Sequence, residues 1–179
     1  GIIASGACAE YVTVEDILKV SERKGTAPFI IICDEIEDPH NLGAIIRTAE
    51  CAGAHGVIIP KRRSSGLTAV VSKSSAGALT HMAIARVPNL ASAVDELKEK
   101  GVWIYAAEAG GKSYYETDFS GGCAIVFGSE GNGVSKIVMD NSDFITSIPM
   151  YGHVNSFNVS TAAAVILLAR VKFLAGDRK

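Results

Sequence analysis

The sequence is poor in cysteine, in aromatic residues and in net charge, and each shortage excludes a class of protein. Among its 179 residues are four cysteines with no C-x-x-C pair, so we expect reduced, buried thiols rather than a disulfide framework. The four histidines are too scattered to suggest a metal site. A net charge of −2 argues against binding nucleic acid by bulk charge and leaves room only for a local basic patch.

Long hydrophobic runs are also missing. The longest charge-free apolar stretch near the C-terminus, residues 161–169, has nine residues, against the ~20 that a membrane-spanning helix needs. No charged-then-apolar leader opens the chain, so we expect a cytoplasmic protein. The first residue is glycine, which suggests a domain cut from a longer protein. With 48% hydrophobic and 20% charged residues, the composition is that of one soluble domain that folds without disulfides or metal.

What the sequence does have is an alternation of apolar runs and amphipathic segments. Residues 29–33 are continuously apolar and rich in β-branched side chains, as in a strand covered on both faces. The alternation predicts an α/β fold, with a mostly parallel sheet and helices on both faces. Ligands of such sheets bind outside the carboxyl ends of the strands. The expected strands are 29–33, 57–60, 82–87, 102–106, 123–127 and 144–148, and the expected helices are 13–24, 42–52, 67–75, 90–100, 134–139 and 158–174.

The loop after the first strand leads into a helix that carries an arginine. Asp38 or Asn41 suits the N-cap and Pro39 suits the first turn, which explains these residues without any function. Arg47 is not explained in this way, because the helix is otherwise apolar up to position 50 and a buried arginine needs an anionic partner. Gly43, one turn earlier, leaves room for a ligand or for backbone. Arg47 is therefore a candidate phosphate contact.

Two later loops are candidates as well. Residues 128–133 have the spacing G-x-x-G-x-G, the reverse of the dinucleotide fingerprint, and they follow a late strand, which disfavours a nicotinamide-dependent enzyme. A plain tight turn explains the glycines but not Glu130 between them. Residues 149–160 are largely polar and precede the most apolar helix, for which Asn158 suits the N-cap. His153 in this loop is left unassigned.

Two further segments are considered as phosphate contacts, and only the second of them remains a candidate. Residues 111–113 look like the end of a phosphate-binding loop, but Ala106 stands where that motif requires a glycine, so the motif fails. The basic run Lys61, Arg62 and Arg63 follows the second strand, on the same edge as the candidate loops. It could contact RNA phosphates, although a solvated surface run explains three basic residues equally well.

Together the three loops resemble the SpoU/TrmH family of RNA ribose 2′-O-methyltransferases, of the SPOUT class. The matching segments 41–49, 127–133 and 148–160 occur in the family's order and spacing. Residues 1–4 and 38–43 look most like the branch that methylates a guanosine of large-subunit ribosomal RNA, whose members often carry a small RNA-binding domain upstream. We accordingly expect a leader segment with a helix at 1–27, a methyltransferase domain at 28–179, and no upstream domain in this chain.

The resemblance implies a deep trefoil knot near the C-terminus that binds S-adenosyl-L-methionine in a bent shape, without a metal. The loops at Gly128 and at 148–158 would form the knot. The adenine would rest against the backbone at Gly128, Ile148 and Phe157; the family usually has leucine where Phe157 stands. The other cofactor contacts implied are Ser129, Gly133 and Met150.

The resemblance also implies catalytic residues. Arg47 matches the family's catalytic arginine, and the remaining motif residues are Asn41, Glu130, Ser156 and Asn158. Because an arginine is normally protonated, we favour Arg47 gripping the phosphate next to the target ribose and lowering the pKa of its hydroxyl. Direct proton abstraction by Arg47 is the alternative. Asn41 would orient Arg47 or the ribose, and Glu130 would hold the loop geometry.

The last helix indicates assembly, because it is apolar on two sides. One stripe can cover the sheet and the other a second copy, and family members are dimers through this knot and helix region. We expect ribosomal rather than transfer RNA as substrate, and no membrane or metal partner. The alternatives are a tRNA methyltransferase and a catalytically silent RNA-binding or assembly module on the same fold. The two stripes are Ala162, Ile166, Ala169 and Phe173, and Ala163, Leu167 and Leu174.

Overall fold

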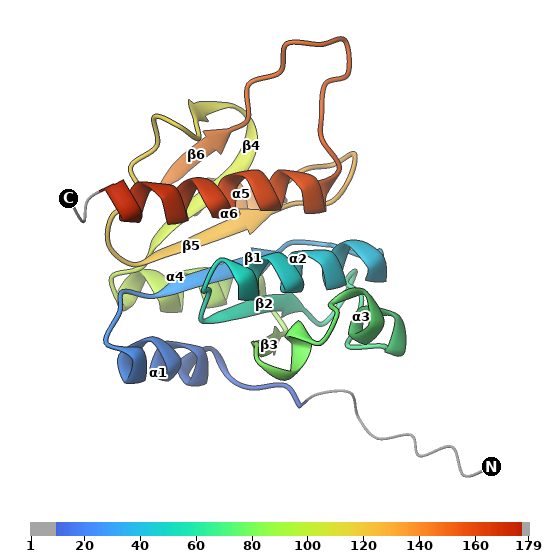
Figure 1. The fold of residues 1–179 in the computed structure, drawn as a ribbon, viewed down its shortest axis with the longest axis vertical. Helices are drawn as coiled ribbons and strands as arrows, with labels where there is room; N and C mark the ends of the chain where they lie inside the picture. Colours follow the sequence, from blue (N-terminus) through green and yellow to red (C-terminus); the bar gives the residue numbers. More distant parts are fainter. Residues whose placement is uncertain (1–9, 177–179) are drawn as a thin grey trace.

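A computed structural model describes residues 10–176, and the predicted α/β fold is confirmed (Figure 1). Six parallel strands form one sheet in the order β3-β2-β1-β5-β4-β6. The matches at residues 1–4 and the thiol of Cys8 lie outside the described residues. The strands are β1 (Phe29–Cys33), β2 (Gly56–Pro60), β3 (Ala83–Val87), β4 (Trp103–Ser113), β5 (Cys123–Phe127) and β6 (Phe144–Ser147).

Helices cover both faces of the sheet. One face packs against α2, α3 and α6, and the other packs against α1, α4 and α5. Successive residues of the central strand β1 alternate between the two cores, so that Ile31 faces the first group of helices and Ile32 the second. The helices are α1 (Val14–Lys24), α2 (Pro39–Cys51), α3 (Ala69–Ser74), α4 (Leu90–Glu99), α5 (Lys136–Asp140) and α6 (Val159–Gly176), with a 3₁₀ turn η1 at Ala78–Thr80.

The helix α1 belongs to the same packed unit as the sheet. Thr13 and Asp16 form a reciprocal capping box at its N-terminus, which fixes where the helix begins. Ile17 and Leu18 are buried in the core that α1 shares with α4. Just before the helix, Val12 pairs with Ala85 of β3. The segment before residue 28 therefore contributes to the core of the domain.

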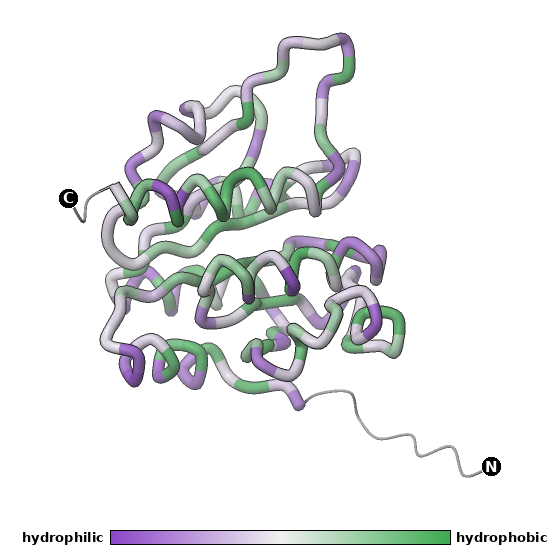
Figure 2. Tube along the Cα trace, in the orientation of Figure 1, coloured by the Kyte–Doolittle hydropathy of each residue, from purple (hydrophilic) through white to green (hydrophobic). Residues whose placement is uncertain are grey.

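Helix α6 lies across the sheet and is one of the most hydrophobic segments in Figure 2. By length and composition alone it could cross a membrane, which the short charge-free run did not predict. It carries Arg170, however, whose guanidinium lies 4.0 Å from the centre of the Phe29 ring while its Nε donates to the Cys123 sulfur at 2.8 Å. The residues of α6 that are buried in the domain are Val159, Ala163, Ile166, Leu167 and Arg170.

The two stripes predicted on α6 do not mark opposite faces. Ala163, Ile166 and Leu167, drawn from both stripes, are all buried against the sheet. The large apolar residues left exposed on α6 are Leu168 and Val171, which are 53% and 37% accessible. Leu168 follows Leu167 of the second stripe, and each residue turns the helix by about 100°. The uncovered face of α6 therefore lies beside the second stripe and not on it.

Two other sequence expectations need correction. The predicted strand 102–106 continues as β4 to Ser113, with an irregular stretch between two pairings to Thr146 of β6. Glycines and polar residues occupy this extension, so no strand pattern is visible there. Cys33 and Cys123 are buried as expected, but Cys51, at the end of α2, is exposed.

Buried His55 makes stability depend on pH. Its Nδ1 accepts the Phe29 N–H at 2.9 Å, and its Nε2 lies 3.0 Å from the Thr26 hydroxyl. Burial, with smaller contributions from the charges of Lys24 and Arg170, lowers the pKa of His55 to about 4. The unfolded chain binds the proton at about pH 6.5, so the free energy of unfolding should fall as the pH decreases from about 6.5 to 4.

Urea unfolding between pH 7 and pH 4 tests this dependence. We expect His55→Asn to be less stable than the wild type at pH 7 but to lose less stability on acidification. His81→Asn, a change of the same kind at an exposed site, should keep the wild-type pH dependence. An unchanged pH dependence in His55→Asn would show that other groups cause the acid instability.

Candidate functional site

A cavity opens at the carboxyl edge of the sheet, where β4, β5 and β6 end. It has a volume of about 650 Å³ and reaches the first turns of α6. All six residues expected to contact the cofactor line this cavity: Gly128, Ser129, Gly133, Ile148, Met150 and Phe157. Three of the expected catalytic residues, Glu130, Ser156 and Asn158, line it as well.

The glycine loop 128–133 turns back on itself tightly. Ser129 and Gly133 exchange two backbone hydrogen bonds, each 3.0 Å long. A Cβ atom on Gly128 would clash with the backbone of Gly133 and of Val134. Gly131 and Gly133 have φ angles of +96° and +66°, which residues with side chains rarely adopt. Three glycines are thus required by the conformation of this wall of the cavity.

Two carboxylates that the sequence analysis did not single out hold the far end of this loop. Glu108, just beyond the regular part of β4, accepts the Val134 N–H at 3.0 Å. Asp34, buried after β1, accepts the Ser135 N–H at 2.7 Å. Both follow strands at the edge where ligands bind, and that position was the available signal for finding them.

Three predicted residues from distant parts of the chain meet in one hydrogen-bonded cluster. Asn158 Nδ2 donates to Glu130 Oε1 at 2.6 Å and to Asn41 Oδ1 at 2.9 Å. Asn41 Nδ2 donates to the same Glu130 oxygen at 3.2 Å. We name this cluster Asn41–Glu130–Asn158. It joins the start of α2, the glycine loop and the start of α6.

The same asparagine also begins helix α6. Asn158 Oδ1 accepts the backbone N–H groups of Ser160 and Thr161 at 3.0 and 3.2 Å, so it is the predicted N-cap. At α2 the cap is Asp38, whose carboxylate accepts from His40 and Asn41. Asn41 is thereby free to use its side chain in the cluster. A second cavity of about 280 Å³ lies on this side, between residues 35–41 and the glycine loop.

Arg47 is not brought to these cavities. It is exposed on α2, it lines neither cavity, and its side chain forms no ion pair or hydrogen bond with another residue in the range 10–176. Arg47 lies six positions after Asn41, or about 9 Å along the helix. The space beside Gly43 holds backbone rather than a ligand: a Cβ there would lie 2.9 Å from the Val71 carbonyl of α3 and would clash with Ser74.

The basic run follows β2 at the same edge of the sheet, and none of its three side chains lines either cavity. Lys61, Arg62 and Arg63 are all exposed. Arg63 is paired with Glu35 at 2.8 Å, a surface ion pair that contributes little to stability. Arg86 of β3 contacts the start of this run, because its Nη2 donates a hydrogen bond to the Lys61 carbonyl at 3.1 Å. Two of the three cations therefore project free of ion pairs with described residues.

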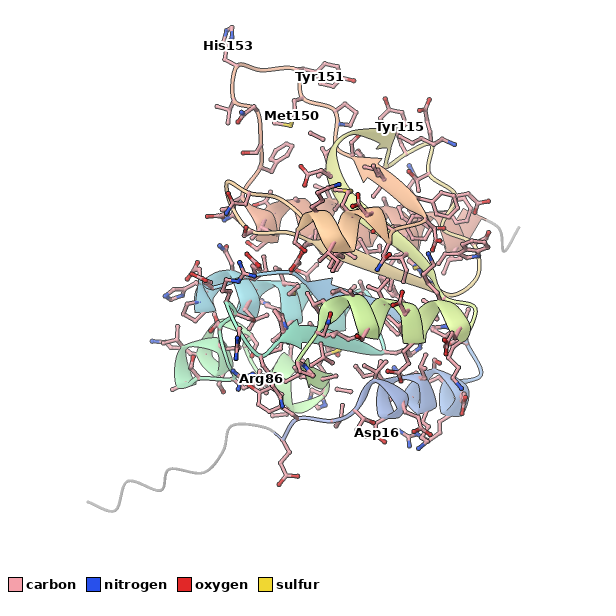
Figure 3. All side chains as sticks on the ribbon, turned by 180° about the vertical axis from the view of Figure 1, so that it is seen from behind. Asp16, Arg86, Tyr115, Met150, Tyr151 and His153 are labelled. Carbon is pink, nitrogen blue, oxygen red and sulfur yellow. The ribbon has the colours of Figure 1, made fainter. Side chains whose placement is uncertain are left out.

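The loop between β6 and α6 stands out from the body of the domain, and Figure 3 shows Met150, Tyr151 and His153 along it. Tyr151 is 92% accessible. The nearby hydroxyl of Tyr115 raises the pKa of Tyr151 above its usual value by charge repulsion and a hydrogen bond. The cavity side of this loop carries Phe157, whose ring is 44% accessible.

The cavity suits the cofactor that the resemblance implies. Its volume is within the range of about 300–1,000 Å³ typical of small-molecule sites. Apolar side chains such as Phe127, Ile148 and Ile166 line one part and could receive an adenine. Backbone of the glycine loop and carboxylate or amide groups line the remainder, where polar parts of a ligand would bind.

Comparison with known proteins agrees with this geometry. The chain is 45% identical over 168 residues to YacO of Bacillus subtilis, assigned to the TrmH family of tRNA/rRNA methyltransferases; the match covers 93% of this chain and 68% of YacO. The SpoU methyltransferase AviRb of Streptomyces viridochromogenes, crystallised with AdoMet, superposes with a TM-score of 0.78 at 27% identity. That match covers 83% of this chain and 59% of AviRb, so the chain spans about three fifths of its structural neighbour.

A third relative is an RNA 2′-O ribose methyltransferase, with a TM-score of 0.75 at 25% identity over 83% of this chain and 57% of that one. The model of the SpoU rRNA Methylase family matches residues 28–168. This range includes the glycine loop, the cluster Asn41–Glu130–Asn158 and the first half of α6. The chain belongs to the SpoU rRNA methylase family.

Proposed function

We propose that this chain transfers a methyl group from S-adenosyl-L-methionine to the ribose 2′-hydroxyl of a guanosine in structured ribosomal RNA. The observation that carries the proposal is the cluster Asn41–Glu130–Asn158 at the wall of a cavity lined by every residue expected to contact the cofactor. The 2′-O specificity of one structural neighbour supports the choice of ribose over base. In this proposal residues 28–179 carry the methyltransferase site, and α1 packs against them as part of the same folded unit. The C-terminal part of the domain forms the trefoil knot.

When bound, the cofactor supplies an activated methyl group on a sulfonium. The protein has to place a ribose hydroxyl in line with that methyl group and to assist the loss of the hydroxyl proton. Glu130, held by two amide groups, fixes the glycine loop against α2 and α6, so the walls of the cavity keep their spacing. Ser156 and Asn158 line the cavity from the loop between β6 and α6. Positioning of this kind supplies much of the rate of a transfer reaction.

Arg47 acts on the RNA rather than on the cofactor in this mechanism. Because it is exposed and lines neither cavity, its guanidinium is available to a substrate that extends from the cavity along α2. There it grips a phosphate next to the target ribose and lowers the pKa of the hydroxyl. Lys61 and Arg62 follow β2, which lies two strands from β5 in the sheet, so they are at the same sheet edge as the glycine loop. They provide further phosphate contacts.

We propose that two copies associate through α6 and the loop that precedes it. Leu168 and Val171 are exposed on α6, and Tyr151 and Val154 are 92% and 70% accessible on the loop. Large apolar side chains exposed on a helix and on the loop before it are typical of an interface. Sedimentation equilibrium should give the mass of a dimer, and Leu168→Glu should shift the protein towards the monomer.

The reaction itself can be tested with methyl-labelled S-adenosyl-L-methionine. Incubation with ribosomal RNA lacking modifications, followed by digestion to nucleosides, should place the label on the 2′-oxygen of guanosine. Label on a base alone would overturn ribose chemistry. Label in tRNA but not in ribosomal RNA would support the second candidate function, a tRNA methyltransferase, which the name of the Bacillus relative also covers. No thermal stabilisation by the cofactor would favour a silent RNA-binding module.

A further inference from the structure

Glu108 lies in a part of the cavity wall that is built by an irregular strand. Ala107 and Lys112 both pair with Thr146 of β6, so the residues between them are extruded from the regular β4 ladder. Gly110 in this bulge has a φ of +81°, and a Cβ on Gly111 would clash with the backbone of Ile145. Bulges of this kind re-aim side chains beside functional sites. Here Ala107, Glu108 and Ala109 line the cavity.

The carboxylate of Glu108 is held in place by backbone. Its Oε1 accepts the Ala109 N–H at 3.2 Å, and its Oε2 accepts the Val134 N–H at 3.0 Å. Gly133 packs so closely against it that a Cβ there would overlap the carboxylate. Glu108 forms no ion pair with any residue in the described range 10–176. A fixed negative charge therefore faces the cavity without a protein cation beside it.

The rest of the lining does not balance this charge. The ionisable side chains that line the 650 Å³ cavity within the described chain are Glu108 and Glu130, and neither lysine, arginine nor histidine is among its lining residues. Glu130 already accepts two amide hydrogen bonds in the cluster Asn41–Glu130–Asn158, whereas Glu108 is bonded only to backbone. A cavity with two carboxylates and no cation favours a cationic ligand.

We propose that Glu108 makes the cavity selective for a positively charged methyl donor over the neutral thioether product. The inference rests on the proposed function, in which S-adenosyl-L-methionine carries a sulfonium and S-adenosyl-L-homocysteine does not. Both molecules carry the same adenine, ribose and amino-acid groups. A contact of Glu108 with a shared group would change both affinities equally, whereas an interaction with the sulfonium charge changes only one.

Isothermal titration calorimetry on Glu108→Gln tests the proposal. The amide oxygen of glutamine can still accept the Val134 N–H, so the loop contact can be retained while the charge is removed. We expect affinity for S-adenosyl-L-methionine to fall by about three- to tenfold, the effect of removing one unit charge from a partly solvated site. Affinity for S-adenosyl-L-homocysteine should change less than about twofold. Sinefungin, which carries an ammonium in place of the sulfonium, should lose affinity as the donor does.

Glu116→Gln is the matched control, because Glu116 is exposed and outside the cavity lining. It removes the same charge and should leave all three affinities unchanged. An equal loss for the three ligands in Glu108→Gln, or no loss for any of them, would overturn the charge selectivity. If the wild-type protein bound none of the three, the proposed function itself would be overturned, a result that the wild-type titration alone identifies.

Discussion

Gly128→Ala is expected to weaken the binding of S-adenosyl-L-methionine by about ten- to hundredfold. The new Cβ would overlap the carbonyl carbon and oxygen of Gly133 and the amide nitrogen of Val134, which are backbone atoms that cannot rotate away. Relief requires breaking the paired Ser129–Gly133 hydrogen bonds and opening the loop. Overpacking typically costs about 1–3 kcal/mol, and each 1.4 kcal/mol is a tenfold change in affinity.

The measurement is calorimetric titration of the folded variant with the cofactor, together with its melting temperature. Gly152→Ala is the matched control, since nothing lies within 4 Å of a Cβ at Gly152 and its backbone angles are ordinary. It lies in the neighbouring loop and should bind the cofactor like the wild type. Wild-type affinity in Gly128→Ala would mean that the glycine loop does not form the cofactor wall.

Arg47→Ala is expected to lower methyl transfer by about 100- to 1,000-fold, the typical cost of removing one group that stabilises developing charge. Because Arg47 lines neither cavity, the affinity for the cofactor should not change. The variant should also fold normally, since an exposed helical arginine without a protein partner contributes little to stability. Single-turnover transfer of labelled methyl to ribosomal RNA measures the effect.

Arg23→Ala removes an exposed arginine from α1, on the other face of the sheet, and serves as the control for lost charge. Arg47→Lys separates the two roles considered for the arginine, which are a phosphate contact and direct abstraction of the hydroxyl proton. A phosphate contact tolerates lysine in part, because the positive charge remains although the bidentate fork is lost. Full activity of Arg47→Ala would remove the residue from the mechanism.

The sequence predicted the fold well because its periodic patterns are strong. Residues 29–33 and 123–127 are apolar throughout, and both strands have those bounds in the structure. The prediction failed where the pattern is weak. The end of β4 contains Gly110 and Gly111 and pairs with β6 through a bulge, which no alternation of side chains announces.

The residues of the candidate site were predicted less accurately than the fold. The resemblance to the SpoU/TrmH family placed Asn41, Glu130 and Asn158 in one site, and their side chains are hydrogen-bonded to one another. Glu108 was missed because it belongs to no motif, and its role depends on its approach to Val134, 26 residues further along the chain. Arg47 was expected to be buried beside an anionic ligand, but it is exposed. Which face of α2 is exposed follows from the packing of α2 against α3 and α6, and the sequence alone does not show that packing.

The side chain of Asn158 connects two parts of the structure, and this determines when the pocket can form during synthesis. One end of its amide starts α6 and the other end closes the contact between α2 and the glycine loop. During synthesis on a ribosome, the strands and α2 emerge before this helix does. The binding pocket can therefore reach its final shape only after the residues of α6 have left the exit tunnel, so a nascent chain stalled before that point should not retain a methyl donor.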